Sequence, residues 1–293
     1  MNMEYDLKPK ISEDHLEKIN KESCVNFFGN WINDIDNLKK QYISNLPFDS
    51  IVIDNFLENS YAEKIYELFP NYNQNSWHTY ENPLEVKYTF DNIDKLPDEI
   101  KNIFYLLSSN EILNIFSEIT GIHNLEYDKY LHGAGLHTYP RNGRLNIHLD
   151  YEKHPISGKE RRVNIILFMT KNWEETWNGD NQLWNNDASE CILKTHVKFN
   201  RAVIFKTNDI SWHGVPDKIT CPTNVFRNSI AYYYVSPLNS LKDEDSYRKK
   251  ANFVKRPEDT YCEKIQKLYD IRPYRRITQK DLDDIFPEWT VEL

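Results

Sequence analysis

Two histidines and one aspartate in this chain have the side chains of a mononuclear iron site. His148 and Asp150 stand two positions apart, His213 follows 63 residues later, and Arg227 comes a further 14 residues on. Two neutral imidazoles and one carboxylate can occupy one face of an octahedral Fe(II) and leave three positions open. Open positions suit a bidentate 2-oxo acid and dioxygen, so these residue types point to an oxygen-activating enzyme.

The spacing of these residues fits short strands. Side chains two positions apart on a strand project to the same face, so His148 and Asp150 can bind one metal together. The His-x-Asp pair alone is a weak signal, because short motifs often arise by chance. In this chain, however, His213 follows the apolar run 202–205, and Arg227 stands at the start of the run 229–235. We therefore expect neighbouring strands of one sheet system.

Composition indicates one soluble enzyme domain with extensions. A chain of 293 residues can bury a sizeable core. Its 36 basic and 45 acidic residues give a formal net charge of −9, which argues against a nucleic-acid partner because phosphate binding normally needs a basic face. No stretch approaches the ~18 apolar residues that span a bilayer, and residues 1–10 are charged without an apolar targeting core. We expect no membrane partner and a cytoplasmic location.

The cysteines agree with that compartment. The four of them have no C-x-x-C spacing, which favours reduced thiols over a disulfide framework or a structural zinc site. They are Cys24, Cys191, Cys221 and Cys262.

Hydrophobic periodicity predicts a β-rich core between two helical extensions. Residues 1–47 form the N-terminal helical extension, residues 48–237 the core domain with supporting helices, and residues 238–293 the C-terminal helical extension. A strand is expected over 48–56, and helices over 61–69 and 96–119. Thr278 and Asp281 resemble a capping box that begins a helix in the last extension. Short strands are expected at 128–139, 144–151, 161–170, 181–185, 192–199, 202–207, 211–215 and 228–236.

Eight short strands of this kind predict a mainly β fold with flanking helices. The expected core is a double-stranded β-helix of the jelly-roll or cupin-like type, whose two sheets leave a pocket between them. The metal site would lie inside that pocket. The C-terminal extension could cover the barrel, form a dimer contact or frame the substrate entrance, and the oligomeric state is not predicted.

The chain resembles the Fe(II)/2-oxoglutarate-dependent oxygenases, in particular their prolyl-hydroxylase-like branch. The resemblance runs over roughly residues 48–237. It rests on the triad and on three further segments in the same order: 161–173, which resembles the third core strand and the turn after it; 178–183, in place of a Gly-Gly-x-Leu hairpin; and 199–205, before the second histidine. The resemblance implies Fe(II) as cofactor, 2-oxoglutarate and O₂ as co-substrates, and ascorbate as a candidate reductant.

The resemblance also implies roles for residues near the triad. His148, Asp150 and His213 would bind the iron, and Arg227 would pair with the far carboxylate of 2-oxoglutarate. Ser229 can assist, because Arg-x-Ser places both side chains on one face and a guanidinium suits a carboxylate. The tyrosine that many relatives use for this carboxylate is replaced by Phe168, which cannot donate a hydrogen bond. Further candidates for co-substrate binding are Asn164, Tyr139 and His137.

The implied reaction hydroxylates an unactivated C–H bond and releases succinate and CO₂. Candidate substrate-lining residues are the aromatic side chains Trp184, Tyr80 and Trp77. A small molecule or a peptidyl residue is the expected substrate, since loops and extensions rather than the fold set the target. The alternatives are a peptidyl-prolyl hydroxylase acting on a protein, a catalytically silent barrel-fold binding protein, and a cupin-like metal enzyme that does not use 2-oxoglutarate.

Overall fold

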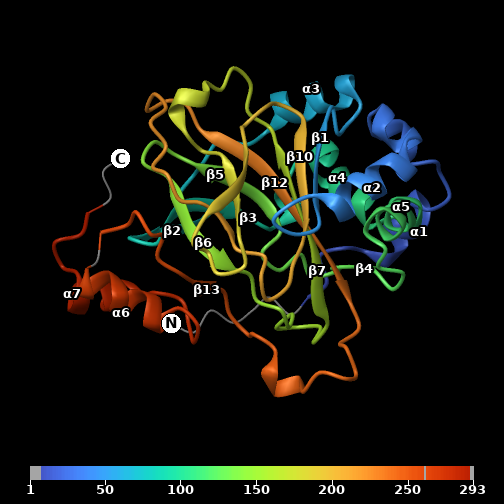
Figure 1. The fold of residues 1–293 in the computed structure, drawn as a ribbon. Coiled ribbons are helices and arrows are strands. Elements are labelled where there is room, and N and C mark those ends of the chain that lie inside the picture. Colours follow the sequence, from blue (N-terminus) through green and yellow to red (C-terminus); the bar gives the residue numbers. More distant parts are fainter. Residues whose placement is uncertain (1–7, 261, 291–293) are drawn as a thin grey trace.

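A computed structural model describes residues 8–260 and 262–290, so the first seven residues of the charged N-terminal segment lie outside the described part (Figure 1). Its strands pair antiparallel in one hydrogen-bonded path, β1-β10-β7-β12-β5-β3-β6-β11-β8-β9, with β2, β4 and β13 attached to it. The strands are β1 (Ser50–Asp54), β2 (His78–Asn82), β3 (Glu85–Phe90), β4 (Glu126–Tyr127), β5 (Gly135–Tyr139), β6 (Arg144–Leu149), β7 (Glu160–Phe168), β8 (Asn181–Trp184), β9 (Cys191–Thr195), β10 (Arg201–Lys206), β11 (His213–Val215), β12 (Arg227–Ser236) and β13 (Asn252–Phe253).

Helices flank this sheet at both ends of the chain. Before the barrel come α1 (Glu13–Ile19), α2 (Ile35–Ser44), α3 (Asn59–Leu68), α4 (Asp98–Ser108) and α5 (Asn110–Thr120), and after it α6 (Glu263–Ile271) and α7 (Gln279–Ile285). Strands β5 to β12 are the eight predicted strands. They curl into a nearly closed antiparallel barrel, and the predicted double-stranded β-helix with flanking helices is confirmed.

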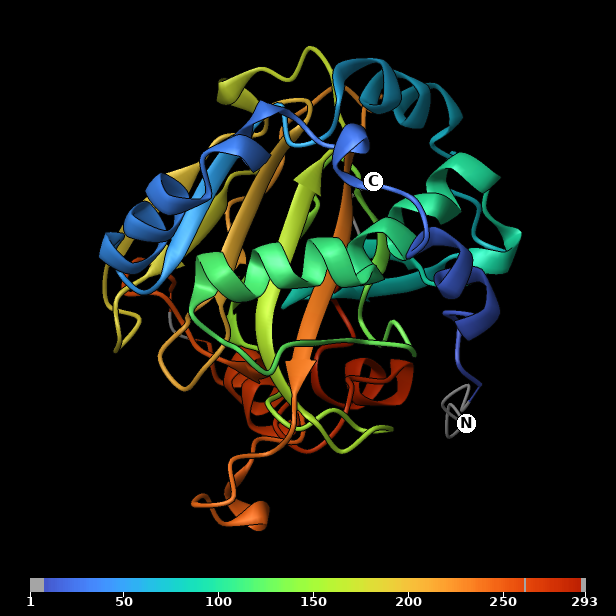
Figure 2. The same ribbon diagram turned by 90° about the vertical axis from the view of Figure 1, so that its right-hand side faces the viewer.

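The long strand β12 shows how one strand separates the core from the pocket. Tyr232 and Tyr234 point to the helical side, where the Tyr232 hydroxyl lies 2.8 Å from the Ser108 hydroxyl and the Tyr234 hydroxyl donates to the Leu107 carbonyl. Tyr233 points to the opposite side, since alternate residues of a strand face opposite ways. Helices α4 and α5 cross this sheet face and bury the main apolar core against β7, β10 and β12 (Figure 2).

Three local predictions differ from the structure. The strand expected over 128–139 begins only at Gly135, because the preceding residues form turns. The helical segment expected over 96–119 is two helices, since Ser109 ends α4 and its hydroxyl caps α5 by accepting from the Ile112 amide. The hairpin of β2 and β3 was not predicted at all, and β3 links the two halves of the barrel by pairing with both β5 and β6.

The C-terminal extension packs on the barrel. Helices α6 and α7 lie beside β2, β6 and β13, away from α4 and α5 (Figure 1). The capping box of Thr278 and Asp281 is present at the start of α7. The extension is not purely helical as expected, because β13 pairs with β6 and adds a strand to the sheet. In the part of the chain that the structure describes, no helix has the length and apolar character to cross a membrane.

Candidate active site

The two histidines and the aspartate of the predicted triad meet at the pairing of β6 with β11. His213 lies directly opposite His148 in the register of these strands, and their ring centroids are 4.3 Å apart. Asp150 follows the last residue of β6. One candidate ligand atom from each side chain can be chosen so that all three lie within 4.8 Å of one another. We call the cavity that these residues line the triad pocket.

Hydrogen bonds fix the orientation of both imidazoles. His148 Nδ1 lies 2.9 Å from the Asn146 carbonyl and His213 Nδ1 lies 2.8 Å from the Ser211 carbonyl. A carbonyl can only accept, so each Nδ1 carries the proton and each Nε2 keeps its lone pair. Both Nε2 atoms face Asp150, at 3.6 Å for His148 and 3.8 Å for His213. A backbone acceptor of this kind commonly orients a metal-binding histidine.

The electrostatics of the triad favour the protonation states that bind a cation. Burial, together with the neighbouring His148, lowers the pKa of His213 to about 4, so its ring is neutral at pH 7. Burial alone would raise the pKa of Asp150, but the charge of Arg161 outweighs it and holds that pKa well below its usual range. Neutral imidazoles and an ionised carboxylate are the forms that bind divalent metals, so the residues present fit Fe(II).

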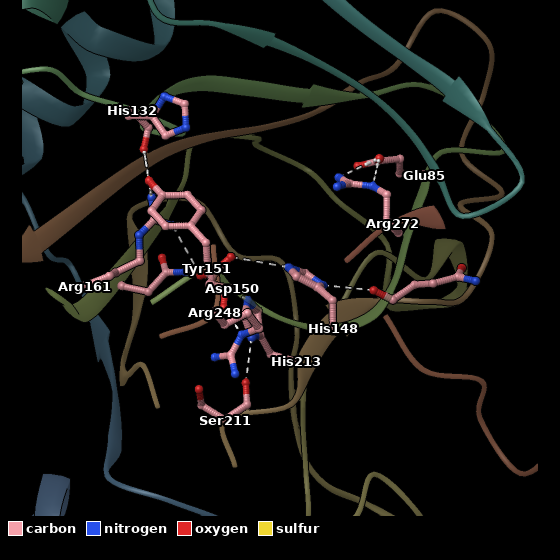
Figure 3. A network of polar contacts seen from close by, with 12 residues as sticks. Glu85, His132, His148, Asp150, Tyr151, Arg161, Ser211, His213, Arg248 and Arg272 are labelled. Atoms are coloured by element: carbon pink, nitrogen blue, oxygen red, sulfur yellow. Dashed lines mark hydrogen bonds and ion pairs between the residues drawn. The ribbon is translucent and has the colours of Figure 1, made fainter. Parts of the chain in front are cut away.

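Arg161 is a buried residue of this site that the sequence analysis did not single out. Its Nη1 lies 3.5 Å from Asp150 Oδ2 (Figure 3). Its guanidinium is stacked between the rings of Tyr151 and Tyr233, 3.7 and 3.4 Å from their centroids. It also donates to the Tyr151 hydroxyl and, at 2.8 Å, to the His132 carbonyl. Arg161 therefore contacts the Asp150 carboxylate from strand β7 in the wall of the barrel.

A β-bulge explains why strand periodicity missed Arg161. Val163 pairs with Tyr234, but the next partner of β12, Val235, pairs with Arg161, so Arg162 is the extra residue. One extra residue reverses the alternation beyond it. Arg161 consequently faces the pocket together with Asn164, although the two are separated by an odd number of positions. The signal that could have found it is a basic residue at the start of an otherwise apolar strand.

Arg227 forms a second buried cationic group in the triad pocket. Its Nε donates to the Gly179 carbonyl at 2.6 Å, while its Nη2 is buried without a hydrogen-bond partner among the described residues. The rings of Tyr139 and Phe168 flank the guanidinium at 4.9 and 4.8 Å. A side chain at Gly179, where φ is +90°, would come within 3.2 Å of Arg227. The unpartnered nitrogen fits an anion that enters the pocket, as 2-oxoglutarate would.

Most other predicted site residues also line the triad pocket. Asn164 donates to Asp150 Oδ2 at 3.3 Å, and its own Oδ1 is buried without a partner among the described residues. Ser229 is paired with both His137 and Phe168 across β12, which places it beside Arg227 on the wall. The predicted residues found in the lining are His148, Asp150, His213, Arg227, Ser229, Asn164, Tyr139, His137 and Tyr80.

Two of the predicted substrate-lining aromatics lie elsewhere. Trp77 is buried in the main core against Phe90 and Tyr72. Trp184 is buried in a small separate cluster with Ile147, and its indole NH donates to Gln182. Neither is part of the lining of the triad pocket, so their aromatic surface is used for packing.

The C-terminal extension supplies residues that no local pattern predicted. The ring of Phe253 on β13 stacks on His148, with centroids 5.1 Å apart. Arg272, after α6, lies over the Phe253 ring. It donates from Nε and Nη2 to Glu85 Oε1 at 3.1 and 3.0 Å (Figure 3). Burial alone would raise the pKa of Glu85, but Arg272 outweighs it and lowers that pKa. Of the three roles left open for this extension, this geometry supports covering the barrel and framing the substrate entrance.

Comparison with known proteins agrees with this arrangement. Residues 134–235 match the family model described as the 2OG-Fe(II) oxygenase superfamily. A prolyl hydroxylase from Trichoplax adhaerens, solved with a hypoxia inducible factor peptide, has 16% identity and a TM-score of 0.51, over 78% of this chain and 95% of that one. A prolyl-4-hydroxylase from Pseudomonas putida has 11% identity and a TM-score of 0.52, over 70% and 100%. At these identities the two structures show a shared fold. No curated protein matches the sequence.

Proposed function

We propose that the triad pocket hydroxylates an unactivated C–H bond of a small molecule or a peptidyl residue, and the match of residues 134–235 to the 2OG-Fe(II) oxygenase superfamily supports this. The observation that supports this most is the placement of two kinds of site in one cavity. His148, Asp150 and His213 offer a metal three ligand atoms, and the buried, unpartnered Nη2 of Arg227 offers an anion a donor.

In this proposal the three ligands would hold Fe(II) through both Nε2 atoms and the Asp150 carboxylate. When bound, iron with 2-oxoglutarate and O₂ supplies the oxidising chemistry that yields succinate, CO₂ and a hydroxylated product. Arg227 would pair with the far carboxylate of 2-oxoglutarate, with Ser229 and Tyr139 beside it on the wall. The stacking of Phe253 on His148 covers one ligand from solvent.

Arg161 and Asn164 would act on the iron through Asp150. Both reach Oδ2 of this carboxylate, at 3.5 and 3.3 Å, and so restrict its rotation. Groups that orient a metal ligand in this way tune metal affinity without contacting the metal. They are positioning residues, and the three ligands are the residues that would touch the iron.

The remaining assignments belong to the same proposal. The segments 1–47 and 238–293 are extensions of a core domain over 48–237, with the second extension contributing to the site through Phe253 and Arg272. We also propose a cytoplasmic location, because the four cysteines have no C-x-x-C spacing and their pattern favours reduced thiols. We propose no nucleic-acid or membrane partner.

Spectroscopy and product analysis test the proposal directly. The protein, loaded anaerobically with Fe(II), should give the weak visible charge-transfer band of a 2-oxoglutarate chelate when 2-oxoglutarate is added. His148→Ala, Asp150→Ala and His213→Ala should each abolish the band and iron-dependent succinate formation, with the circular dichroism of the barrel retained. Asp187→Ala, which removes an exposed carboxylate, is the matched control and should keep both signals. Succinate formation at the wild-type rate in any triad variant would remove that residue from the site.

A further inference from the structure

The triad pocket carries a charge opposite to that of the whole chain. Seven basic side chains and two acidic ones line it, whereas the formal net charge of the chain is −9. Fe(II) and 2-oxoglutarate would bring charges of equal size and opposite sign, so binding both would leave this excess of positive charge unchanged. The excess therefore needs a reason other than the proposed cofactor and co-substrate.

Five of the seven cations have an observed or proposed partner, and Lys250 is one of them. Arg161 pairs with Asp150, and Arg272 pairs with Glu85. Arg227 is the proposed partner of 2-oxoglutarate. The exposed Lys249 pairs with a neighbouring carboxylate on its own loop.

Lys87 and Arg276 are different, because both lie beside the ring of one tyrosine, Tyr80. Lys87 is the direct cross-strand neighbour of Tyr80 in the β2–β3 hairpin, and its Nζ lies 5.3 Å from the ring centroid. The Arg276 guanidinium, from the segment between α6 and α7, lies 5.1 Å from the same centroid. Within residues 8–260 and 262–290, neither cation has a carboxylate within ion-pair distance or a side-chain hydrogen bond.

Both side chains are partly buried, so their charges are not fully hydrated. Burial lowers the pKa of Lys87, and the more distant Glu85 and Asp150 only partly offset this effect. Two incompletely solvated cations beside one ring repel each other, and a partly buried charge is costly without a counter-charge. A negatively charged group between them would remove both penalties.

We propose that Lys87, Arg276 and the Tyr80 hydroxyl bind an oxyanion, a carboxylate or a phosphate group, of the primary substrate. The inference rests on the proposed function, because it assigns a substrate class to the same pocket. The site is built from the β2–β3 hairpin and the C-terminal extension, whereas Arg227 lies on β12. The two groups of cations therefore belong to different elements of the same pocket. A lysine and an arginine together can serve either kind of oxyanion.

Small methyl-bearing anions can test this site before the substrate is known. The probes are acetate, methyl phosphate and the neutral acetamide, each detected by saturation-transfer NMR through its methyl protons. The protein is loaded anaerobically with Fe(II) and 2-oxoglutarate, so that Arg227 is occupied, and the chelate band is recorded in the same sample. Acetate or methyl phosphate should bind and acetamide should not. The stronger anion shows whether the substrate carries a carboxylate or a phosphate.

Variants then locate the anion. Lys87→Met and Arg276→Met should each weaken binding by at least about tenfold, the size expected when one charge-assisted contact is lost. Arg276→Lys keeps the charge and should retain most of the binding, which separates loss of charge from misfolding. Lys280→Met removes an exposed lysine of the same extension and should bind as the wild type does.

The outcomes separate this inference from the proposed function. A normal chelate band without anion binding, equal binding of acetamide and acetate, or unchanged binding in both methionine variants would overturn the oxyanion site and leave the proposed function standing. Absence of the band in the wild-type protein would overturn the proposed function and, with it, this inference.

Discussion

Arg161 and Arg227 are both buried in the wall of the triad pocket, yet they have different partners. Arg161 contacts Asp150 and is enclosed by two tyrosine rings. Arg227 donates from Nε to a backbone carbonyl, and its Nη2 has no hydrogen-bond partner in the part of the chain that the structure describes. A guanidinium that already contacts the carboxylate is suited to orient a ligand, and one with an open donor is suited to bind an incoming anion.

Replacing each arginine by methionine should therefore impair different steps. Arg161→Met should weaken Fe(II) binding by about 10–100-fold, as is typical when the group that orients a metal ligand is removed. Arg227→Met should leave Fe(II) binding nearly intact and weaken 2-oxoglutarate binding by roughly 2–5 kcal/mol, the usual cost of removing one partner of a buried charge pair. Chelator competition measures the first quantity, and anaerobic titration of the chelate band measures the second.

The two variants are controls for each other, because both remove one buried guanidinium from the same pocket. Arg161→Lys should recover part of the iron affinity, since an ammonium can still contact Asp150. If Arg161→Met kept its iron affinity and instead required more 2-oxoglutarate, the roles of the two arginines would be exchanged.

At the level of elements, one chain of contacts links the C-terminal extension to both the triad and β3, in addition to the pairing of β13 with β6 and the apolar packing. It runs from His148 to Phe253, from Phe253 to Arg272, and from Arg272 to Glu85 on β3. The last contact is a buried ion pair, with only 8% and 3% of the two side chains exposed. Removing one partner of such a pair leaves an uncompensated charge in the interior.

Arg272→Met should thus detach the extension locally. We expect a loss of about 3–5 kcal/mol, the range seen when a buried pair is broken, with faster hydrogen exchange in β13 and α6 than in β7. Arg275→Met serves as the matched control. Arg275 lies three residues after Arg272, is half exposed and pairs with Asp281. A largely exposed arginine contributes less, about 1 kcal/mol or below.

Exchange measured by mass spectrometry distinguishes the two variants. Equal exchange rates of β13 in Arg272→Met and wild type would mean that strand pairing with β6, and not the ion pair, holds the extension. The double variant Glu85→Gln, Arg272→Met removes both charges and should recover part of the lost protection.

For the molecule as a whole, the sequence predicts those features of the fold and the site that depend on local residue patterns. The spacing of two predicted that His148 and Asp150 lie together, and period-two alternation predicted that Asn164 faces the pocket. Eight of the strands followed from β-rich runs between turns. The β2–β3 hairpin was missed because its residues mix charged and aromatic types, so apolar alternation is weak.

Local sequence patterns could not predict contacts between segments that are distant in the sequence. Glu85 and Arg272 are 187 positions apart, and nothing at either position shows that the other will approach. Arg161 faces the pocket only because of a bulge whose position depends on pairing with β12. Trp77 and Trp184 were expected at the substrate because aromatic residues serve packing and binding equally well, and burial decides which.

The closed barrel also has a consequence for acid stability. Burial, assisted by Arg161, lowers the pKa of His132 to about 3, and burial, assisted by Lys87 and Arg227, lowers that of His137 to about 3. An unfolded chain binds these protons near pH 6.5, but the native protein does not. The stability contributed by the neutral rings is thus complete above about pH 6.5 and is lost as the pH falls toward 3. As the pH falls below about 6.5, each ring should lower the free energy of unfolding by roughly 1 kcal/mol per pH unit.

Urea unfolding of the metal-free protein between about pH 7.5 and about pH 4.5 measures this loss. The double variant His132→Gln, His137→Gln should lose stability less steeply than wild type as the pH falls, because its unfolded state gains two fewer protons. His123→Gln, which removes an exposed histidine, is the control and should follow the wild-type curve. Identical slopes for the double variant and wild type would mean that both rings take up protons in the folded barrel, and the pocket would then be far better hydrated than its lining indicates.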